Sequence, residues 1–423
     1  MLKMRINKKN KRLLILTLFL IILSFLFGFM GNNHFEMILI TVGFIVVFMY
    51  AKVSYYTIFS FILWFSFLQE YFASISRALS SGRLLWDTSV PIYHTELFIC
   101  TISFFIFELM LFSSTNILQD EKELYKHPLK LNRRVAYIFT CIANVFVFLA
   151  YPSLPSLHSE LSRDMGIISS SLIVPISTLL FAICYDHFKK SAFIRVNILI
   201  GILWIVLHGD RVIVLGLLIY YVLRYLNDSS VDRKKVKESL FNKRYILVGV
   251  GLLIVALLFI RIQTTRMGYE YTFNWATFMN SMLRQSTAAD VVHCFNCSVD
   301  MLKKGNLLYG YTYLYYLSNL LPSANQSFNP AMILMDKYNT LGGGLFFIEP
   351  MMNGGVVLSI IQSGLFVGML GWIFSKKTRY APFLAVPFCI LIFRFAWYGS
   401  LAGLVKMLCY YTPVIYLISK KFK

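Results

Sequence analysis

The sequence places four polar or small residues, His208-Gly209-Asp210-Arg211, between two very apolar runs. An arginine is costly beside hydrocarbon, so it usually pairs with an anion or faces a water-filled cavity. The planar guanidinium group of Arg211 is well shaped to hold a phosphate or pyrophosphate through two parallel hydrogen bonds. An alternative of equal weight is that Arg211 pairs with Asp210 or reaches lipid headgroups.

Three further arginines lie downstream of this group: Arg261, Arg266 and Arg284. Each one alone is explained as a surface anchor. Together with Arg211 they suggest a cationic cavity on the outer face of a membrane, where the positive-inside bias normally makes arginine scarce.

Glu349 lies in a glycine-rich stretch that also contains Pro350, Asn353 and Gly355. Glycines allow tight turns and close approach of the backbone. One interpretation is that Glu349 and Pro350 only mark the start of a helix, where a carboxylate and a proline are both favourable. The other is that Glu349 contacts substrate as an acid or a base.

Histidine and cysteine give a weaker signal. Cys294 and Cys297 follow His293, but a zinc site needs a second pair of ligands that the sequence does not offer, so no metal is expected. A local disulfide and two unpaired thiols both remain open. His94 and Glu96 lie near one end of an apolar run and Glu108 near the other, and we expect all three to face water.

The elements that must position these residues are set by the composition. The chain has 423 residues, of which 58% are hydrophobic and only 14% charged, too few charges for a soluble protein of this size. The net charge of +20 does not indicate a nucleic-acid binder, because the basic residues are spread between apolar runs. The sequence predicts an all-α, polytopic integral membrane protein formed by one membrane domain, 1–423.

Runs near 20 apolar residues are long enough to cross a bilayer as helices. We predict twelve spans: 13–30, 35–51, 53–72, 92–113, 135–151, 167–186, 193–208, 211–226, 245–262, 350–374, 381–398 and 401–418. With this count most Lys and Arg residues fall in alternate loops, which places both termini in the cytoplasm.

The connection 263–349, about 85 residues long, is predicted to be a large external loop between the ninth and tenth spans, and structureless loops of that length are uncommon. Amphipathic stretches at 273–304 and 306–321 predict short helices lying at the outer membrane surface.

No Walker A loop, dinucleotide fingerprint, HExxH, GxSxG or Asp-rich magnesium motif is present. An enzyme of this sequence would therefore act on a substrate that arrives already activated, at an outward-facing site, without a cofactor.

The segment 200–400 resembles the Wzy family, the repeat-unit polymerases of bacterial surface polysaccharides. Three motifs carry the resemblance: Gly209-Asp210-Arg211 at a helix start, Gly310-Tyr311-Thr312-Tyr313 followed by Leu321-Pro322, and Glu349 followed by Asn353 and Gly355. The first half of the chain is similar only in its hydrophobic character.

The resemblance implies a metal-independent glycosyltransferase of the bacterial cytoplasmic membrane. It would join O-antigen or related repeat units carried on undecaprenyl pyrophosphate, and the resemblance implies a chain-length regulator as partner. By position Arg211 would hold the pyrophosphate, with Arg266 or Arg284 assisting. Glu349 or Asp210 would deprotonate the acceptor, His208 and His293 compete for that role, and Tyr313 and Asn353 would contact glycan.

Two alternatives from the same pathway remain. A lipid-linked oligosaccharide flippase would have short loops and a charged central cavity, which the long external loop argues against. An O-antigen ligase also has an external loop and arginines, but its motifs match less well.

Overall fold

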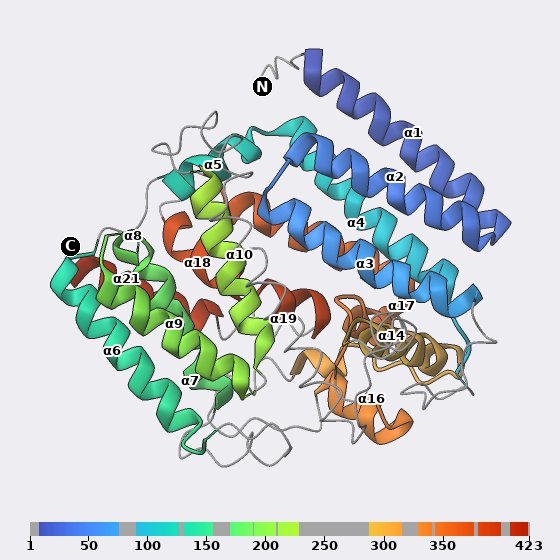
Figure 1. The fold of residues 1–423 in the computed structure, drawn as a ribbon. Coiled ribbons are helices and arrows are strands. Elements are labelled where there is room, and N and C mark those ends of the chain that lie inside the picture. The colour runs from blue at the N-terminus through green and yellow to red at the C-terminus, as the bar shows by residue number, and fades with distance from the viewer. Residues whose placement is uncertain are drawn as a thin grey trace, which may run out of the picture. The chain divides into compact units, whose positions relative to one another are not determined.

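The computed structural model describes residues 8–75, 90–126, 131–154, 170–188, 190–208, 210–227, 287–314, 329–340, 343–375, 380–398 and 407–421. Every regular element in these ranges is a helix, and one parallel β-bridge joins Gly344 to Tyr398 (Figure 1). The all-α fold class is confirmed.

The first half contains α1 (Lys8–Met30), α2 (Asn33–Ala51), α3 (Tyr55–Ile75), α4 (His94–Ser114), α5 (Ile117–Lys126), α6 (Arg133–Ala150), α7 (Ser170–Ile183), α8 (Tyr185–Phe188), α9 (Ala192–Leu207) and α10 (Arg211–Asn227). The second half contains α14 (Thr287–Lys303), η3 (Tyr311–Tyr313), α16 (Pro330–Tyr338), α17 (Ile348–Ile373), α18 (Ala381–Ile390), α19 (Ile392–Trp397), η5 (Met407–Tyr411) and α21 (Thr412–Lys421).

The described helices overlap the predicted spans, but 245–262 and the first residues of 167–186 and 401–418 lie outside the described residues. Three spans are interrupted, and in one of them, 350–374, the backbone is non-helical at Gly354 and Gly355. The segment 167–186 is divided between α7 and α8, and 381–398 between α18 and α19, which follows the proline inside α18, Pro387. A proline removes a backbone donor and clashes with the preceding turn, so a helix break close to it is expected.

Among the described residues four helices are long and apolar enough to cross a membrane: α2, α4, α6 and α17. This supports a membrane protein, while the count of twelve spans stays a prediction.

Helix α2 illustrates the membrane character. One face of the helix is buried and includes Leu39, Gly43 and Val47. The opposite face is equally apolar yet exposed, with Ile38 and Met49 at 58% and 68% of their surface. A helix that is hydrophobic on all sides while half exposed fits contact with lipid.

The chain divides into two compact units. Unit 1 comprises Met1–Glu121, Trp275–Ala385 and Ile392–Tyr410, and unit 2 comprises Lys122–Asn274, Val386–Leu391 and Tyr411–Lys423. Each unit is described by itself.

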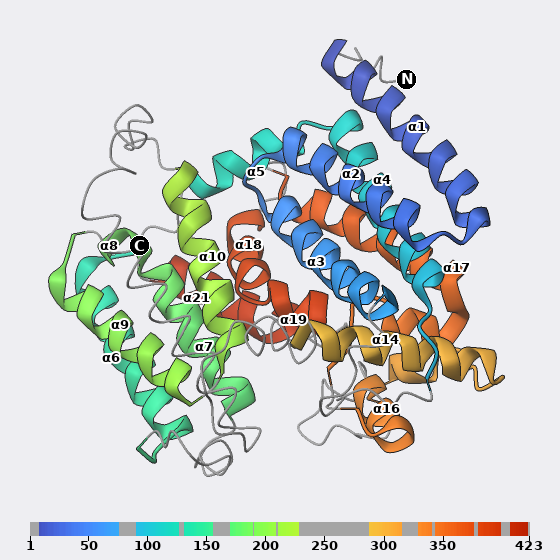
Figure 2. The same cartoon turned by 45° about the vertical axis from the view of Figure 1, so that its right-hand side comes forward.

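In unit 1 the helices α1 to α4 lie side by side, and α17 packs against α4 (Figures 1 and 2). Four phenylalanines form the aromatic centre of this packing. They are Phe59 of α3, Phe104 of α4, Phe366 of α17, and Phe346, which precedes the first residue of α17. Their ring centroids are 4.9 to 6.4 Å apart. Such pairs contribute about 0.5–1.5 kcal/mol each beyond burial, and here they fix the start of α17 against α3 and α4.

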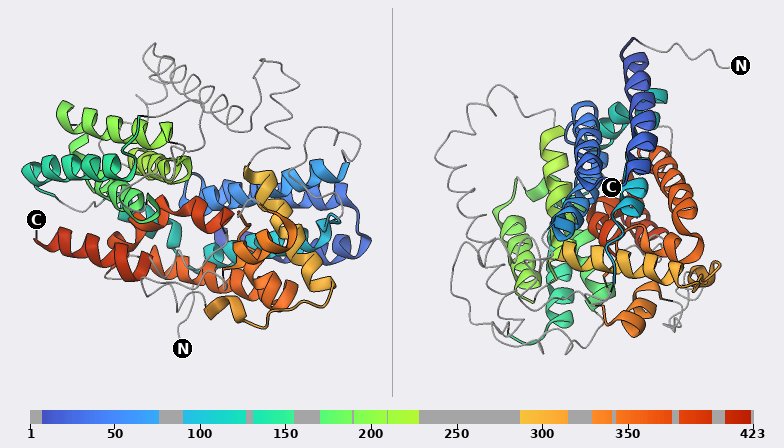
Figure 3. Two further views of the ribbon diagram at one scale, coloured as in Figure 1. Left: turned by 90° about the horizontal axis from the view of Figure 1, so that it is seen from below. Right: turned by 90° about the vertical axis from the view of Figure 1, so that its right-hand side faces the viewer.

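Helix α14 runs crosswise to α3 and lies at its end (Figures 2 and 3). It also packs against α16 and α17. The sequence predicted an amphipathic helix lying on a surface here, but residues 289–301 are buried on all sides. The helix is present, but its apparent polar face contacts protein, because Asn296 and Asp300 bind groups on neighbouring segments.

In unit 2 α6, α7, α9 and α10 pack together. A β-carbon at Gly216 of α10 would overlap the Ile390 carbonyl group, so this close approach to α18 requires glycine. Arg224 bonds the Tyr125 carbonyl oxygen and pairs with Asp186, which gives this buried cation its partners.

Candidate functional site

Helix α17 is broken six residues after it begins. Gly354 and Gly355 have non-helical dihedrals, and Gly355 has φ +67° and ψ −155°, a conformation essentially confined to glycine. A β-carbon at Gly355 would lie 3.1 Å from Leu302 Cδ2. The break separates a short first segment carrying Glu349 and Asn353 from the rest of the helix.

The segment 308–313 docks on that first segment. The Leu308 amide donates to the Met352 carbonyl oxygen at 2.9 Å, and the Gly310 amide donates to Asn353 Oδ1 at 2.8 Å. Gly310 has φ +90°, so it turns the chain where an L side chain would be strained. Two of the three motifs noted in the sequence are therefore joined in unit 1.

Thr312 is the centre of this junction. Its Oγ1 accepts a hydrogen bond of 2.6 Å from Asn353 Nδ2 and donates one of 3.0 Å to Glu349 Oε1. Asn353 Nδ2 also donates to the Glu349 carbonyl oxygen at 2.8 Å. Thr312 and Glu349 are fully buried. We call Thr312, Glu349 and Asn353 the motif cluster.

Tyr313 lies next to the motif cluster, and its hydroxyl donates to Gln362 Oε1 at 3.3 Å. Burial, and then the negative charge of Glu349, raise the pKa of Tyr313 far above its ordinary value, so its hydroxyl stays a donor. Tyr309 and Tyr311 on the same turn expose 85% and 45% of their surface. The junction thus presents two aromatic rings at the surface above a buried carboxylate.

Asp210 and His208 belong to unit 2. Asp210 Oδ2 accepts a bond of 3.4 Å from the Tyr151 hydroxyl, and Asp210 is 5% exposed. His208 Nδ1 lies 2.8 Å from the Trp204 carbonyl oxygen, and Nε2 lies 3.0 Å from the Ser153 carbonyl oxygen. A ring nitrogen must carry a proton to bond a carbonyl, so this geometry favours a structural role for His208 over that of a base.

Arg211 is the first residue of α10, and its side chain lies outside what the structure describes. Arg261, Arg266 and Arg284 also lie outside the described residues. The cationic cavity predicted from these arginines stays a prediction.

His293, Cys294 and Cys297 lie on α14 and are buried. Neither cysteine forms a disulfide, and His293 Nε2 is 3.5 Å from Cys297 Sγ. Burial, helped by the charge of Asp290, raises the pKa of Cys294 well above its ordinary value and keeps the thiol protonated. No group of three or more metal-ligating side chains occurs among the described residues.

Unit 1 also contains a cavity of about 620 Å³ that sequence analysis missed. Its polar lining is Asn33, Ser74, His94, Thr95, Glu96 and Lys303. These residues come from the start of α2, the end of α3, the start of α4 and the end of α14. We call this cavity the polar pocket.

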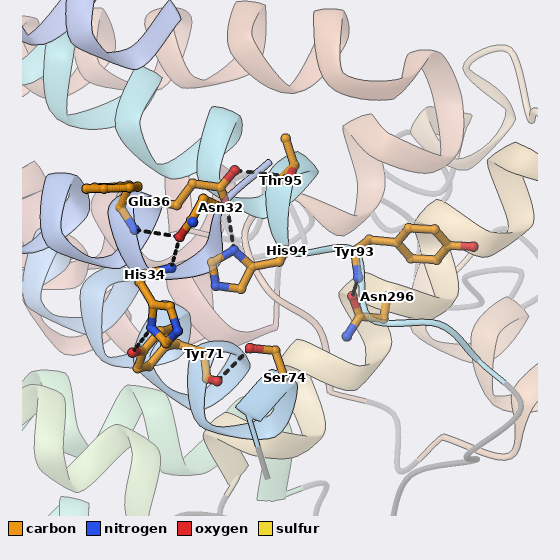
Figure 4. Close-up of polar contacts among 10 residues, drawn as sticks. Asn32, His34, Glu36, Tyr71, Ser74, Tyr93, His94, Thr95 and Asn296 are labelled. Atoms are coloured by element: carbon orange, nitrogen blue, oxygen red, sulfur yellow. Dashed lines mark hydrogen bonds and ion pairs between the residues drawn. The ribbon is translucent and has the colours of Figure 1, made fainter. Parts of the chain in front are cut away.

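His94 and Glu36 form a buried pair at the polar pocket. His94 Nδ1 lies 2.5 Å from Glu36 Oε2, while Glu36 Oε1 accepts a bond of 3.1 Å from Thr95 Oγ1 (Figure 4). Glu36 is fully buried and His94 is 5% exposed. The ring of His94 is also held by Phe67, whose centroid lies 4.7 Å away.

The other ring nitrogen, His94 Nε2, is buried without a hydrogen-bond partner. An ionised carboxylate only accepts, so in this bond Nδ1 carries the proton, and in the neutral form of the ring Nε2 holds a lone pair. A histidine oriented by a carboxylate, on a residue that lines a cavity and with its second nitrogen unpartnered by the protein, is the arrangement used for general bases.

The rest of the lining is held rigidly. Lys303 Nζ pairs with Glu96 Oε1 at 2.7 Å and lies 4.2 Å from the centroid of the Tyr93 ring. The Tyr93 amide donates to Asn296 Oδ1 at 2.9 Å (Figure 4), and Asn296 Nδ2 donates to Glu70 Oε2 at 3.1 Å. These bonds connect α3, α4 and α14 around the polar pocket.

The expectation that His94 and Glu108 face water was wrong. Glu108 is fully buried and accepts a hydrogen bond from Ser60 Oγ. Both side chains find polar partners on neighbouring helices, Glu36 and Ser60, and a single sequence does not reveal such pairings. The one available signal was the presence of ionisable residues within apolar segments, which marks functional sites more often than chance.

Comparison of the chain with protein-family models, with curated proteins and with solved structures found no match.

Proposed function

We propose that the protein polymerises oligosaccharide repeat units carried on undecaprenyl pyrophosphate at the outer face of a bacterial cytoplasmic membrane. One observation carries this proposal. The segments Gly310–Tyr313 and Glu349–Gly355, singled out in the sequence for their resemblance to such polymerases, form one hydrogen-bonded cluster in unit 1.

The reaction needs no nucleotide. An acceptor hydroxyl attacks the anomeric carbon of the donor glycan, the bond from that carbon to the pyrophosphate oxygen breaks, and the lipid pyrophosphate leaves with the electron pair. The acceptor proton passes to a base. Arg211, with Arg266 or Arg284, would offset the negative charge that develops on the leaving group. Asp210, which precedes Arg211 in the sequence, stays a candidate for the base that deprotonates the acceptor.

Within unit 1, the motif cluster would position a turn that contacts glycan. Glu349 is fully buried and bonded to Thr312, so in this arrangement it holds the turn 308–313 in place. That turn exposes Tyr309 and Tyr311, and exposed aromatic rings provide apolar faces against which sugar rings can pack. Tyr313 and Asn353 act by fixing this turn rather than by touching the reacting atoms.

The predicted topology agrees with an outward-facing site. The start of α2, the end of α3, the start of α4 and the segment 263–349 all fall on the predicted outer side, and both termini fall on the cytoplasmic side. A chain-length regulator is the protein partner expected from the resemblance.

The gel pattern of the surface polysaccharide tests the proposal. The gene is deleted and complemented with wild type, with Arg211→Ala, or with Arg134→Ala as a control at an exposed arginine on the predicted cytoplasmic side. We expect the deletion and Arg211→Ala to leave lipopolysaccharide core that carries a single repeat unit, because export and attachment of the units still operate. Arg134→Ala should restore the ladder of longer chains on the gel. Losing one charge-stabilising donor typically costs 10²–10³-fold in rate.

Loss of every repeat from the core would overturn the proposal. Accumulation of lipid-linked polymer would then indicate a ligase, and single units retained inside the cell would indicate a flippase.

A further inference from the structure

The polar pocket of unit 1 has features of a ligand site that the resemblance does not account for. Its volume of about 620 Å³ is in the range of small-molecule sites. It also holds a histidine nitrogen, His94 Nε2, that is buried and unpartnered. A buried polar atom without a partner costs free energy, so Nε2 calls for a partner that the protein itself does not supply.

The charges of the pocket indicate what kind of ligand fits. Lys303 is already paired with Glu96, and His94 is paired with Glu36. No surplus positive charge remains among these groups to bind a phosphate or pyrophosphate. The lining instead offers hydroxyl, amide and carboxylate groups from Ser74, Thr95, Asn33 and Glu96, which suit a neutral ligand rich in hydroxyl groups.

We propose that the polar pocket binds the acceptor sugar and that His94 Nε2 takes the proton from the attacking hydroxyl. This inference rests on the proposed function. It assigns to the polar pocket of unit 1 only the acceptor sugar, while the donor pyrophosphate stays assigned to the arginines of the proposed function.

One proton moves in the proposed step, from the acceptor hydroxyl to His94. The acceptor O–H bond breaks as the new bond from its oxygen to the anomeric carbon forms, and the proton passes to His94 Nε2. The resulting imidazolium is stabilised by Glu36, which lies 2.5 Å from Nδ1. The lipid pyrophosphate leaves with the electron pair of the broken glycosidic bond, and the proton later returns to water.

A purely structural role is the competing account, because the same pair also joins α2 to α4. His94→Asn separates the two accounts. The asparagine amide occupies the place of Nδ1 and can still donate to Glu36, but no nitrogen remains at the position of Nε2. His34→Asn is the matched control, because His34 lies on α2, is exposed and bonds the Tyr71 hydroxyl at 2.8 Å (Figure 4).

The test uses the purified full chain in proteoliposomes with undecaprenyl-pyrophosphate-linked repeat units. We expect His94→Asn to melt at the wild-type temperature but to polymerise about 10²–10⁴-fold more slowly, the usual contribution of a general base. His34→Asn should match wild type in both respects. Polymerisation at the wild-type rate by His94→Asn would overturn the inference and leave the proposed function intact.

A second readout does not depend on activity and covers the case in which His94→Asn fails to fold. Diethyl pyrocarbonate is used as the reagent for His94, which lines the polar pocket, and mass spectrometry follows the labelling of the wild-type protein. Soluble repeat-unit oligosaccharide is the probe, and we expect it to slow the labelling of His94 but not of His34. Labelling of His94 that the oligosaccharide does not slow would contradict the acceptor site. Failure of the wild-type protein to make any polymer would instead contradict the proposed function.

Discussion

Thr312 of η3 and Asn353 of α17 are joined by a hydrogen bond of 2.6 Å from Asn353 Nδ2 to Thr312 Oγ1. Through Thr312 the bond extends to Glu349, at 3.0 Å. Because all three side chains are buried, the bond organises the turn 308–313 without contact with solvent. Removing the hydroxyl of Thr312 should therefore change the conformation of the turn 308–313 and shorten the polysaccharide that the protein makes.

Thr312→Val tests this expectation. Valine keeps the shape of threonine but removes the hydroxyl that bonds Asn353 and Glu349. We expect a loss of about 1–3 kcal/mol in stability, the usual cost of an unsatisfied buried polar group, together with a shortened ladder. Thr312→Ser retains the hydroxyl and should keep most of both. Thermal unfolding and the gel ladder are measured together, and equal behaviour of Thr312→Val and wild type would contradict the account.

The break in α17 requires glycine at position 355. Gly355→Ala should cost about 1–3 kcal/mol, because an L residue is strained at φ +67° and its β-carbon would press on Leu302. Gly368→Ala, in the same helix, meets no atom within 4 Å and should be neutral or stabilising by about 0.5–1 kcal/mol. Unfolding temperatures of the two purified variants give the comparison, and the prediction fails if they change alike.

Asp300 gives a prediction about pH. Burial acts to raise the pKa of Asp300, but hydrogen bonds from Lys304, Tyr338 and Tyr93 outweigh it, so the pKa lies below its ordinary value. A lowered pKa means that the native state favours the ionised form. Its stabilising effect is complete above the unfolded carboxylate pKa of about 3.9 and is lost as the pH falls through the lower folded-state value.

Asp300→Asn measures this effect. The variant should be less stable than wild type at neutral pH, because the hydrogen bonds from Tyr338 at 2.8 Å and Tyr93 at 3.3 Å lose a charged acceptor. The loss should be about 1–3 kcal/mol and should shrink below about pH 4. Melting curves at several pH values test this, and a difference that stays constant down to about pH 3 would refute the assignment.

Polymerisation should persist when divalent metals are removed. In the proposed mechanism arginine side chains, rather than a metal ion, offset the charge of the leaving pyrophosphate. Initial rates in proteoliposomes with and without EDTA should therefore agree. A loss of activity in EDTA that Mg²⁺ restores would require a metal in the mechanism.

The helical architecture could be predicted from the sequence because apolar runs of sufficient length leave few alternatives. Helices α2 and α4 begin within two residues of the starts predicted for their spans. The interruption of 381–398 was not predicted, although Pro387 offered a signal. Where a proline-containing helix breaks depends on packing that the local sequence does not encode.

The candidate site could be predicted only in part. The glycines around Glu349 indicated a special backbone, and Gly355 does adopt a positive φ. The bond between Asn353 and Thr312 could not be derived from either motif alone. The pairing of His94 with Glu36 joins different helices, and it needs the fold to bring the residues together.

The burial of α14 shows a further limit. Hydrophobic periodicity distinguishes polar from apolar faces, but it does not distinguish a face in contact with water from one that bonds protein groups. Asn296 and Asp300 made α14 resemble a surface helix, yet both are buried and bonded.

The most direct test of the central claim is the stoichiometry of the reaction in proteoliposomes that contain only the purified protein and undecaprenyl-pyrophosphate-linked repeat units. The account predicts a ladder of lipid-linked polymers and the release of one undecaprenyl pyrophosphate for each new glycosidic bond. Movement of intact units across the bilayer, with neither polymer nor free undecaprenyl pyrophosphate, would contradict it.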